Sequence, residues 1–209
     1  MIAVIDYNMG NVRSVANAFE SLGCEVEITN QRAVLEKADH IILPGVGAFG
    51  EGMNHLKELG LIGVLRDEVL KKKKPFLGIC LGMQLLADEG FEFGHHPGLG
   101  WISGSAKKLE PGDLALPHVG WNNFKVTQNC RILDRIGGGA DFYYVHSYYF
   151  AASRKENVNA VCEYGQDFPA VISQENIYGV QFHPEKSQKA GKILLENFVK
   201  LTAQLSSRA

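Results

Sequence analysis

Residues 76–84 read Phe76-Leu77-Gly78-Ile79-Cys80-Leu81-Gly82-Met83-Gln84, a Gly-x-Cys-x-Gly pattern between an apolar strand and a helix. The strand is expected over Pro75–Ile79, and the helix is expected from Cys80 to about Ala87. A sharp turn of this kind is a nucleophile elbow, in which one residue takes a strained backbone conformation. Glycines two positions before and after that residue remove Cβ atoms that would collide in the turn. The pattern therefore predicts that the Cys80 thiol lies at the carboxyl end of a strand.

The setting of Cys80 gives its thiol a candidate chemical role. A helix N-terminus favours negative charge and hence the thiolate, and the backbone N–H of Leu81 can bind an oxyanion. A buried structural cysteine at a strand–helix junction would carry the same pattern, so other parts of the chain must separate the two interpretations. The other cysteines are Cys24, Cys130 and Cys162; because no Cys-x-x-Cys pair exists, neither a zinc site nor a redox dithiol is expected.

Strand-like and helical patterns alternate on the amino-terminal side of this junction. Short apolar runs predict strands at Ile2–Asp6, Glu25–Ile28 and Ile41–Leu43. One apolar face predicts a helix that starts at Val12 and is closed by Gly23, and two more helices are expected at about 51–59 and 61–71. Such alternation is typical of a largely parallel sheet covered by helices on both faces.

The pattern changes after Gly98. Between Gly98 and Ser173, short strand-like runs indicate an antiparallel or mixed extension of the sheet; they cover 105–109, 123–127, 142–150, 159–164 and 170–174. A further strand is expected at Ile177–Phe182, followed by an amphipathic closing helix over 188–204. We therefore expect an α/β protein with a central, mostly parallel sheet flanked by helices and a mixed or antiparallel extension, folded as one domain over residues 1–209.

The composition agrees with a compact domain and disfavours some classes of function. The 209 residues are 45% hydrophobic, which is enough for a core of ordinary size. A formal net charge of −2 argues against a nucleic-acid binder held by phosphate contacts, and the basic run at 71–74 is expected to be a solvated helix end. No signal peptide and no apolar stretch approaching about 20 residues is visible, so a cytoplasmic location without membrane contact is expected.

A second candidate group stands near the carboxyl terminus, in Phe182-His183-Pro184-Glu185. A cysteine nucleophile needs a base beside the thiol and a third group that orients the base. His183, at the end of a predicted strand, can exchange the thiol proton. Glu185 points the same way if the strand continues, and it can accept a hydrogen bond from the other imidazole nitrogen. Cys80, His183 and Glu185 are therefore the predicted catalytic residues.

Together these segments resemble the class I glutamine amidotransferases. Residues 78–84 look like the nucleophile motif of that family, 182–185 like its His–Glu motif, and Pro44-Gly45-Val46-Gly47 like its oxyanion loop. The resemblance implies a flavodoxin-like core and hydrolysis of glutamine to glutamate and ammonia through a thioester on Cys80. It also implies an oxyanion hole made by backbone N–H groups, drawn from Gly45, Val46, Gly47 and Leu81.

The same resemblance implies the substrate contacts. Gln84, one helical turn after Cys80, is expected to bind glutamine from the helix, and Glu92 is a candidate for its amino group. Ser147 and Tyr148 are expected to contact the substrate through main-chain groups. No cofactor and no metal ion are implied.

Within the family, the motifs are similar to the glutaminase subunits of imidazole glycerol phosphate synthases. This likeness implies a heterodimer with a (βα)8-barrel cyclase subunit that uses the ammonia in histidine biosynthesis. The segment Pro117–Asn122 is expected as an exposed aromatic loop, with His118 and Trp121 at the cyclase interface, although a turn with a core tryptophan would also fit. Asn8 departs from the glycine expected there and leaves partner contacts at that position open.

Three alternatives remain open at this point. A paralogous glutaminase could feed a different synthase, for example one that forms an amidine on a surface sugar. A cysteine peptidase of the same superfamily is disfavoured by Gln84 and the Gly45–Gly47 loop, which suit a small amide. A non-catalytic binding domain on this fold is disfavoured by the joint presence of Cys80, His183 and Glu185.

Overall fold

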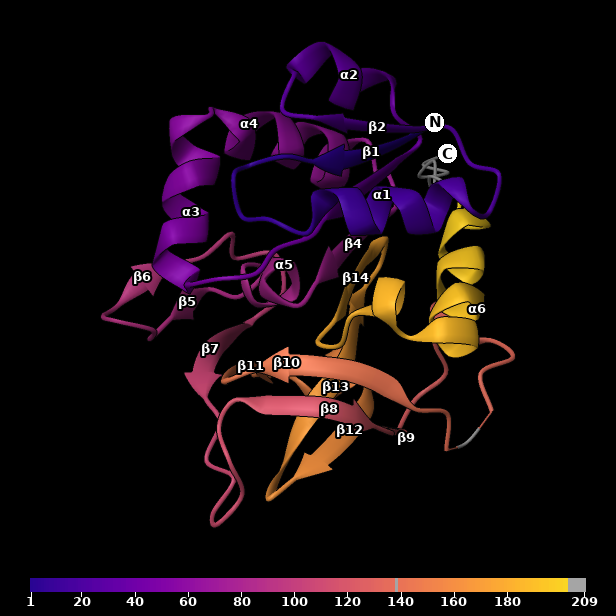
Figure 1. Ribbon diagram of the computed structural model, residues 1–209. Helices are drawn as coiled ribbons and strands as arrows, with labels where there is room; N and C mark the ends of the chain where they lie inside the picture. The colour runs from indigo at the N-terminus through magenta and orange to yellow at the C-terminus, as the bar shows by residue number, and fades with distance from the viewer. Residues whose placement is uncertain (138, 203–209) are drawn as a thin grey trace.

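A central sheet runs through the computed structural model, which describes residues 1–137 and 139–202 (Figure 1). Within these residues the sheet has eight strands in the order β2-β1-β3-β4-β14-β13-β12-β9. The strands are β1 (Ile2–Ile5), β2 (Val26–Thr29), β3 (His40–Leu43), β4 (Phe76–Ile79), β9 (Lys125–Val126), β12 (Val158–Tyr164), β13 (Gln166–Gln174) and β14 (Ile177–Val180). The run from β2 to β14 is parallel, and β13, β12 and β9 add to it antiparallel. The predicted fold class is therefore confirmed.

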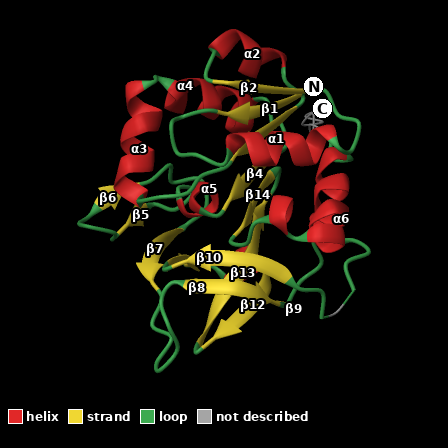
Figure 2. Ribbon diagram, viewed as in Figure 1, coloured by secondary structure: helices red, strands yellow, loops and turns green. Residues whose placement is uncertain are grey.

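Helices cover both faces of this sheet, because successive side chains of a strand point to opposite faces. In β1, Ile2 and Val4 join a buried cluster that includes side chains of α1 (Val12–Glu20) and α6 (Gln188–Val199). Ala3 and Ile5 join a second cluster on the other face, with α2 (Arg32–Lys37), α3 (Phe49–Glu58) and α4 (Leu61–Leu65). Figure 2 shows the two groups, with α1 beside α6 and α3 beside α4.

Two smaller sheets lie beside the antiparallel part. One pairs β10 (Phe142–His146) with β8 (His118–Asn122). The other has the order β11 (Tyr148–Ala152), β7 (Gly104–Lys108), β5 (Glu89–Gly90), β6 (His96–Pro97). Because Ser147 separates β10 from β11, the prediction of one strand over 142–150 is wrong, and its two halves belong to different sheets. The strand predicted over 123–127 is also misplaced, since residues 118–122 form β8 and only β9 pairs within that range.

Several elements end or divide differently from the sequence-based expectation. The helix after Cys80, α5, covers only Leu81–Gln84, because the chain then turns back and Asp88 N–H donates to Gly104 O at 3.0 Å. The pattern over 61–71 divides into α4 and a π-helical turn at Arg66–Lys71. β14 ends at Val180 rather than at residue 182. The closing helix α6 ends at Val199, and its expected residues 203 and 204 lie outside the described residues.

The carboxyl ends of β1, β3, β4 and β14 meet at one edge of the parallel part. The strand order reverses between β1 and β3, and the crevice outside such a reversal is the usual ligand site of open α/β sheets. The loops that follow these four strands contain residues 6–11, 44–48, Cys80 and 181–187, which are far apart in the sequence. None of the described helices has the length and apolar composition needed to cross a membrane.

Candidate active site

Cys80 lies at the turn between β4 and α5, with φ 52° and ψ −107°. Its N–H donates to Val180 O at 2.8 Å, which ties the turn to the end of β14. A Cβ atom on Gly78 would lie 2.5 Å from the Gly82 carbonyl oxygen, and one on Gly82 would collide with the Leu43 carbonyl. Both glycines are thus required by backbone approaches, and the turn has the elbow geometry that their spacing predicts.

His183 and Glu185 form a pair that is wholly buried. Nδ1 of His183 lies 2.8 Å from Oε1 of Glu185, and neither side chain is exposed. A 3-10 turn over Pro184–Lys186 brings them together, rather than the continued strand expected from the sequence. The chain leaves the sheet at this point, because His183 N–H donates to Tyr143 O at 2.8 Å. The two residues meet as predicted, but by a different backbone route.

The surroundings of His183 favour the imidazolium. Burial opposes the charged form and is the largest single influence, but the adjacent Cys80, the hydrogen bond to Glu185 and the negative charges of both outweigh it and raise the pKa of His183 to about 10. Nε2 of His183 is buried and makes no hydrogen bond of standard geometry with any described residue, and the Cys80 thiol is the group that it meets. The site can therefore hold a thiolate–imidazolium pair, the form in which a cysteine is nucleophilic.

Asn11 completes this group, although no sequence pattern predicts a role for it. Its Nδ2 donates to Oε1 of Glu185 at 2.5 Å and lies 3.4 Å from Nδ1 of His183. Asn11 precedes α1 in the left-handed conformation, with φ 64°. The amide therefore holds the carboxylate from a second direction. The contact joins residues 174 positions apart, so no local pattern in the sequence could reveal it.

Two of the four expected oxyanion donors, the N–H groups of Val46 and Leu81, are engaged with other groups in this structure. Val46 N–H donates to Met9 O at 3.0 Å, and Leu81 N–H donates to Gly45 O at 3.3 Å. Gly47 has φ 119°, a conformation open mainly to glycine. The peptide between Gly45 and Val46 takes part in both bonds, through its oxygen and its N–H. A single rotation of this peptide would release both donors together.

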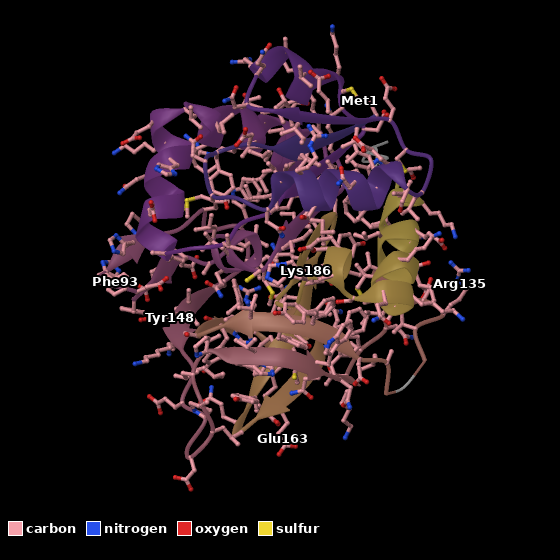
Figure 3. The ribbon with its side chains drawn as sticks, in the orientation of Figure 1. Met1, Phe93, Arg135, Tyr148, Glu163 and Lys186 are labelled. Atoms are coloured by element: carbon pink, nitrogen blue, oxygen red, sulfur yellow. The ribbon has the colours of Figure 1, made fainter. Side chains whose placement is uncertain are left out.

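A pocket of about 370 Å³ opens beside Cys80. It is lined by most of the residues expected to contact substrate or oxyanion: Val46, Gly47, Leu81, Gln84, Glu92, Ser147 and Tyr148. Phe93 and Tyr148 also border it, and Figure 3 shows these two at the same edge of the molecule. The structure thus gathers residues from separate loops around one cavity that suits an amino acid.

Two glutamines connect the pocket wall to the thiol. Gln84 Nε2 donates to Tyr148 O at 2.8 Å and to Gln181 Oε1 at 3.3 Å. Gln181 Nε2 in turn lies 3.7 Å from Cys80 Sγ. Sequence reasoning missed Gln181. The available signal was a polar residue within an apolar run, two positions before His183.

Glu92 has a structural contact in addition to its place in the pocket wall. Its Oε2 accepts a hydrogen bond from Phe49 N–H at 2.9 Å, at the start of α3. Burial raises the pKa of the Glu92 carboxyl, while the Phe49 N–H and the neighbouring His96 act in the opposite direction. One oxygen is therefore committed to the helix end, and the other remains for a ligand.

The structure separates the two residues expected at a partner interface. Trp121 is 49% exposed and Val119 is 55% exposed, on the outer side of β8. His118 is only 3% exposed, because it occupies an alternate position of the same strand and points inward. The expectation of an exposed loop at Pro117–Asn122 is thus wrong, and His118 does not lie on the surface that Trp121 presents.

The described part of the chain contains no group of three or more His, Cys, Asp or Glu side chains placed to hold a metal ion. The polar groups around Cys80 instead suit acyl transfer, with a nucleophile, a paired imidazole and latent N–H donors at one strand edge.

Comparison with known families and proteins gives consistent matches over nearly the whole chain. Residues 3–201 match the family model described as glutamine amidotransferase class-I. Imidazole glycerol phosphate synthase subunit HisH 1 of Campylobacter jejuni (strain RM1221) is 48% identical over 202 residues, which cover 96% of this chain and 100% of that protein. HisH 2 of Methanococcus maripaludis is 46% identical, over 96% and 99% of the two chains. HisH of Aquifex aeolicus is 44% identical, over 98% of each.

Solved structures give a matching fold at low sequence identity. A crystal structure of a glutamine amidotransferase aligns with a TM-score of 0.74 and 19% identity, covering 95% of this chain and 100% of that one. The structure of PurLQS from Thermotoga maritima aligns with a TM-score of 0.74 and 19% identity, covering 95% and 96% of the two chains.

Proposed function

The chain belongs to the class I glutamine amidotransferase family, and from that premise we propose that its Cys80 pocket hydrolyses glutamine to glutamate and ammonia. The ammonia passes to a cyclase subunit that forms imidazole glycerol phosphate and 5-aminoimidazole-4-carboxamide ribonucleotide in histidine biosynthesis. The observation that carries the chemical part is Cys80 in an elbow conformation beside the buried His183–Glu185 pair. The names of the relatives, which are subunits of imidazole glycerol phosphate synthase, support the destination of the ammonia.

The reaction follows from the protonation state of the pair. The Cys80 thiolate attacks the carbonyl carbon of the glutamine side-chain amide, and the charge that develops on oxygen enters the oxyanion hole. The His183 imidazolium gives its proton to the amide nitrogen, and the C–N bond breaks. Ammonia departs, and a γ-glutamyl thioester remains on Cys80. Neutral His183 then takes a proton from water, whose oxygen attacks the thioester. Glutamate departs, Cys80 returns as the thiolate, and Glu185 holds the imidazole throughout.

The engaged oxyanion donors support a glutaminase that is weak in the free chain. While Val46 N–H binds Met9 O and Leu81 N–H binds Gly45 O, neither is available to a developing negative charge. Each donor of this kind contributes roughly 2.7–4 kcal/mol to transition-state stabilisation in comparable enzymes. Rotation of the Gly45–Val46 peptide on partner binding would turn the site on, and the conformational freedom of glycine permits it.

The partner is a cyclase subunit with a (βα)8-barrel fold, joined in a heterodimer. Ammonia in bulk water is lost to protonation and diffusion, so direct delivery to a second active site is an advantage. The exposed apolar side chains of Val119 and Trp121 support a docking surface on the outer side of β8. His118 takes no part in it, because its side chain is buried.

A second destination for the ammonia has support in the names of the relatives. Several carry a copy number, such as HisH 1 of Campylobacter jejuni and HisH 2 of Pseudomonas aeruginosa, the latter 43% identical over 202 residues. Numbered copies indicate that such a subunit can occur more than once in an organism. A paralogue that feeds another synthase, for example in amidine formation on a surface sugar, would share the half-reaction at Cys80.

The test measures glutamate release from glutamine with and without the cyclase subunit. We expect strong stimulation by the cyclase in the wild type and no glutamine use by Cys80→Ala. The complex that contains Cys80→Ala should still form product from ammonium salts, because the cyclase site is intact. Cys24→Ala is the matched control, since Cys24 precedes β2 and does not line this pocket, and its activity should equal that of the wild type.

Two outcomes contradict separate parts of the proposal. Glutamine hydrolysis by Cys80→Ala would show that another group is the nucleophile. Glutaminase activity that no histidine-pathway cyclase stimulates would shift the proposal to the paralogue, and the same assay with a different synthase would then identify its partner.

A further inference from the structure

His118 and His146 form a buried pair next to the pocket, and the proposed mechanism uses neither of them. They occupy facing positions on β8 and β10 and are 3% and 6% exposed. Nδ1 of His118 lies 3.1 Å from Nε2 of His146. The His118 ring stacks on Tyr164 and Tyr144, with ring centroids 3.9 Å and 4.9 Å away. Both rings are thus held in fixed orientations.

The contact at Tyr148 determines the tautomer of His146. Nδ1 of His146 lies 2.9 Å from the Tyr148 carbonyl oxygen. A carbonyl can only accept, so Nδ1 of His146 carries the proton. Burial, the largest influence, lowers the pKa of His146 to about 3, so the ring is neutral and its Nε2 is an acceptor. Nδ1 of His118 must therefore donate to it.

The proton position on His118 is determined independently by its contact with Asn122. Asn122 Nδ2 lies 3.0 Å from the Glu163 carbonyl oxygen, and Asn122 Oδ1 accepts from Asn123 N–H at 2.9 Å. These two contacts fix which atom of the amide is nitrogen. The same Nδ2 lies 3.4 Å from Nε2 of His118, so that nitrogen accepts. Burial lowers the pKa of His118 to about 4, and the ring is neutral with its proton on Nδ1.

Three hydrogen bonds thus run in one direction, from Asn122 through His118 and His146 to the Tyr148 carbonyl. Figure 3 labels the residues at the two ends, Glu163 at the tip of β12 and Tyr148 beside the pocket. Both ends meet backbone carbonyls, so the direction cannot reverse without leaving a buried polar group unpaired. We call this set the histidine chain, consisting of Asn122, His118, His146 and the Tyr148 carbonyl.

The Tyr148 carbonyl is where the histidine chain meets the pocket. It accepts one hydrogen bond from His146 and a second, at 2.8 Å, from Gln84 Nε2. Two bonds use both of its lone pairs, so this oxygen holds Gln84 and the 146–148 segment in place and is not free to bind substrate. Gln84, His146, Ser147 and Tyr148 all line the pocket.

We propose that His118 and His146 are positioning residues for glutamine binding, acting as fixed neutral Nδ1–H tautomers that orient the Tyr148 carbonyl and, through it, Gln84 and the 146–148 wall. The proposal rests on the proposed glutaminase function of the same pocket. It assigns the histidine chain an effect on substrate affinity rather than on the chemical step, because the hydrogen bonds of the Cys80 thiol go to Val145 and Gln181 and to none of its members.

Nitrogen NMR of the full-length chain with labelled histidine tests the tautomers without any assay of activity. His118 and His146 should both show a protonated Nδ1 and an unprotonated Nε2, and these signals should not change between pH 7.5 and about pH 5. The signal that disappears in His118→Gln is assigned to His118, which leaves the other signal to His146. An Nε2–H tautomer at either residue, or protonation of either ring near pH 6.5, would overturn the proposal.

Kinetics of Asn122→Asp with the cyclase subunit test the effect on substrate. The carboxylate cannot donate to His118, so the chain loses its first bond at nearly constant volume. We expect the KM for glutamine to rise about 10-fold with kcat within about 2-fold of the wild type, the pattern of lost ground-state binding. Asn123→Asp is the matched control, because its exposed side chain carries the same change of charge, and it should keep the wild-type KM.

A second pair of variants covers the case in which Asn122→Asp does not fold. His118→Phe preserves stacking with the tyrosines but makes no hydrogen bond, whereas His118→Gln can both donate to His146 and accept from Asn122. The phenylalanine variant should show the raised KM for glutamine, and the glutamine variant should show the wild-type KM. Any other pattern, including a fall in kcat at unchanged KM, contradicts the positioning role.

The two proposals fail in distinguishable ways. A wild-type chain that does not hydrolyse glutamine even with a cyclase would remove the proposed function, while the NMR signals would still report on the histidine chain. A wild-type chain that is active, with Asn122→Asp and His118→Phe at the wild-type KM, would remove only the further inference.

Discussion

Cys80 holds a backbone conformation that few residues other than glycine adopt, with φ 52° and ψ −107°. Such a conformation costs on the order of 1–3 kcal/mol and persists only where the surrounding structure offsets it. Here the offset comes from the Val180 hydrogen bond and from two glycines that let β3, β4 and α5 approach closely. The strained backbone at Cys80 therefore lowers the stability of the fold, but it places the thiol beside the pocket and His183.

The His183–Glu185 pair predicts how stability depends on pH. The pKa of His183 in the folded protein, about 10, is above its value of about 6.5 in an unfolded chain. Protonation of this group therefore stabilises the fold fully below about pH 6.5, and that stabilisation is lost as the pH rises towards 10. We expect the free energy of unfolding in urea to fall between pH 7 and pH 10.

Glu185→Gln isolates the contribution of the pair. Removing the carboxylate lowers the pKa of His183 in the folded protein, so the fall in stability should still begin near pH 6.5 but should end at a lower pH and be smaller in total. Cysteines and tyrosines that are buried in the fold also ionise on unfolding in this range. Those that do not contact His183 contribute equally to both curves, so the difference between the curves reports on His183 and its contact with Cys80. The exposed Glu156→Gln is the control. Identical curves for the wild type and Glu185→Gln would contradict the assignment.

Tyr7 gives a second prediction for a single side chain. It is fully buried, and its hydroxyl makes no hydrogen bond to any described residue. Burial, followed by the nearby Cys80, raises the pKa of the phenol, so the group stays neutral. A buried hydroxyl without a partner costs roughly 1–3 kcal/mol. Tyr7→Phe should therefore stabilise the free chain by about 1 kcal/mol, measured by urea unfolding at pH 7; a loss of stability would indicate a partner for the hydroxyl.

Among the elements, α5 is short and closely packed, and its glycine is set by the neighbouring strand. A Cβ atom on Gly82 would collide with the Leu43 carbonyl of β3, whose backbone is fixed in the sheet. In contrast, a Cβ atom on Gly63 of α4 would meet nothing within 4 Å. The two glycines therefore have opposite requirements although both lie in helices.

Alanine at these two positions should change stability in opposite directions. Gly82→Ala should destabilise the protein by about 1–3 kcal/mol, as other overpacked sites do. It should also lower glutaminase activity, because the elbow must shift. Gly63→Ala should stabilise by roughly 0.5–1 kcal/mol, since alanine favours the helix. Thermal unfolding of both variants measures this, and equal effects would show that the packing of α5 against β3 is not the cause.

At the scale of the molecule, exposed apolar side chains occur both on the oxyanion loop and on β8. Val46 of the oxyanion loop and Val119 and Trp121 of β8 are among the large hydrophobic side chains that the structure leaves exposed. Lys186, labelled near the centre of Figure 3, lies with its Nζ 5.6 Å from the ring centroid of Tyr143, the cross-strand neighbour of Trp121. A partner on this surface would reach both β8 and the loop that controls the oxyanion donors.

Trp121→Ala should weaken binding of the cyclase subunit. Large aromatic side chains at the centre of an interface contribute about 2 kcal/mol or more, which corresponds to about 30-fold in Kd. Calorimetric titration with the cyclase measures the loss of affinity. At a saturating concentration of cyclase, the glutaminase activity of the variant should return to the wild-type level. Val126→Ala on β9 is the control, because Val126 is 45% exposed on a different strand. An unchanged Kd for Trp121→Ala would place the docking surface elsewhere.

The sequence by itself determined the parts of this protein that depend on neighbours along the chain. Periodic apolar runs located β1, α1, β3 and β4, because side-chain direction in a strand or helix repeats over a few residues. Glycine spacing located the Cys80 elbow, and the His183–Glu185 spacing located the buried pair. The strands between residues 98 and 173 were less accurate, since their pairing is set by partners distant in sequence.

Only the tertiary structure decided which groups meet across the fold. Asn11 reaches Glu185 over 174 residues, and Gln181 reaches Cys80 over 101, so no local signal could pair them. The inward direction of His118 depends on which face of β8 is covered, and the oxyanion donors depend on a peptide whose orientation glycine leaves free. Local sequence fixes the chemistry that each residue can offer, whereas long-range packing fixes which residues are close enough to use it.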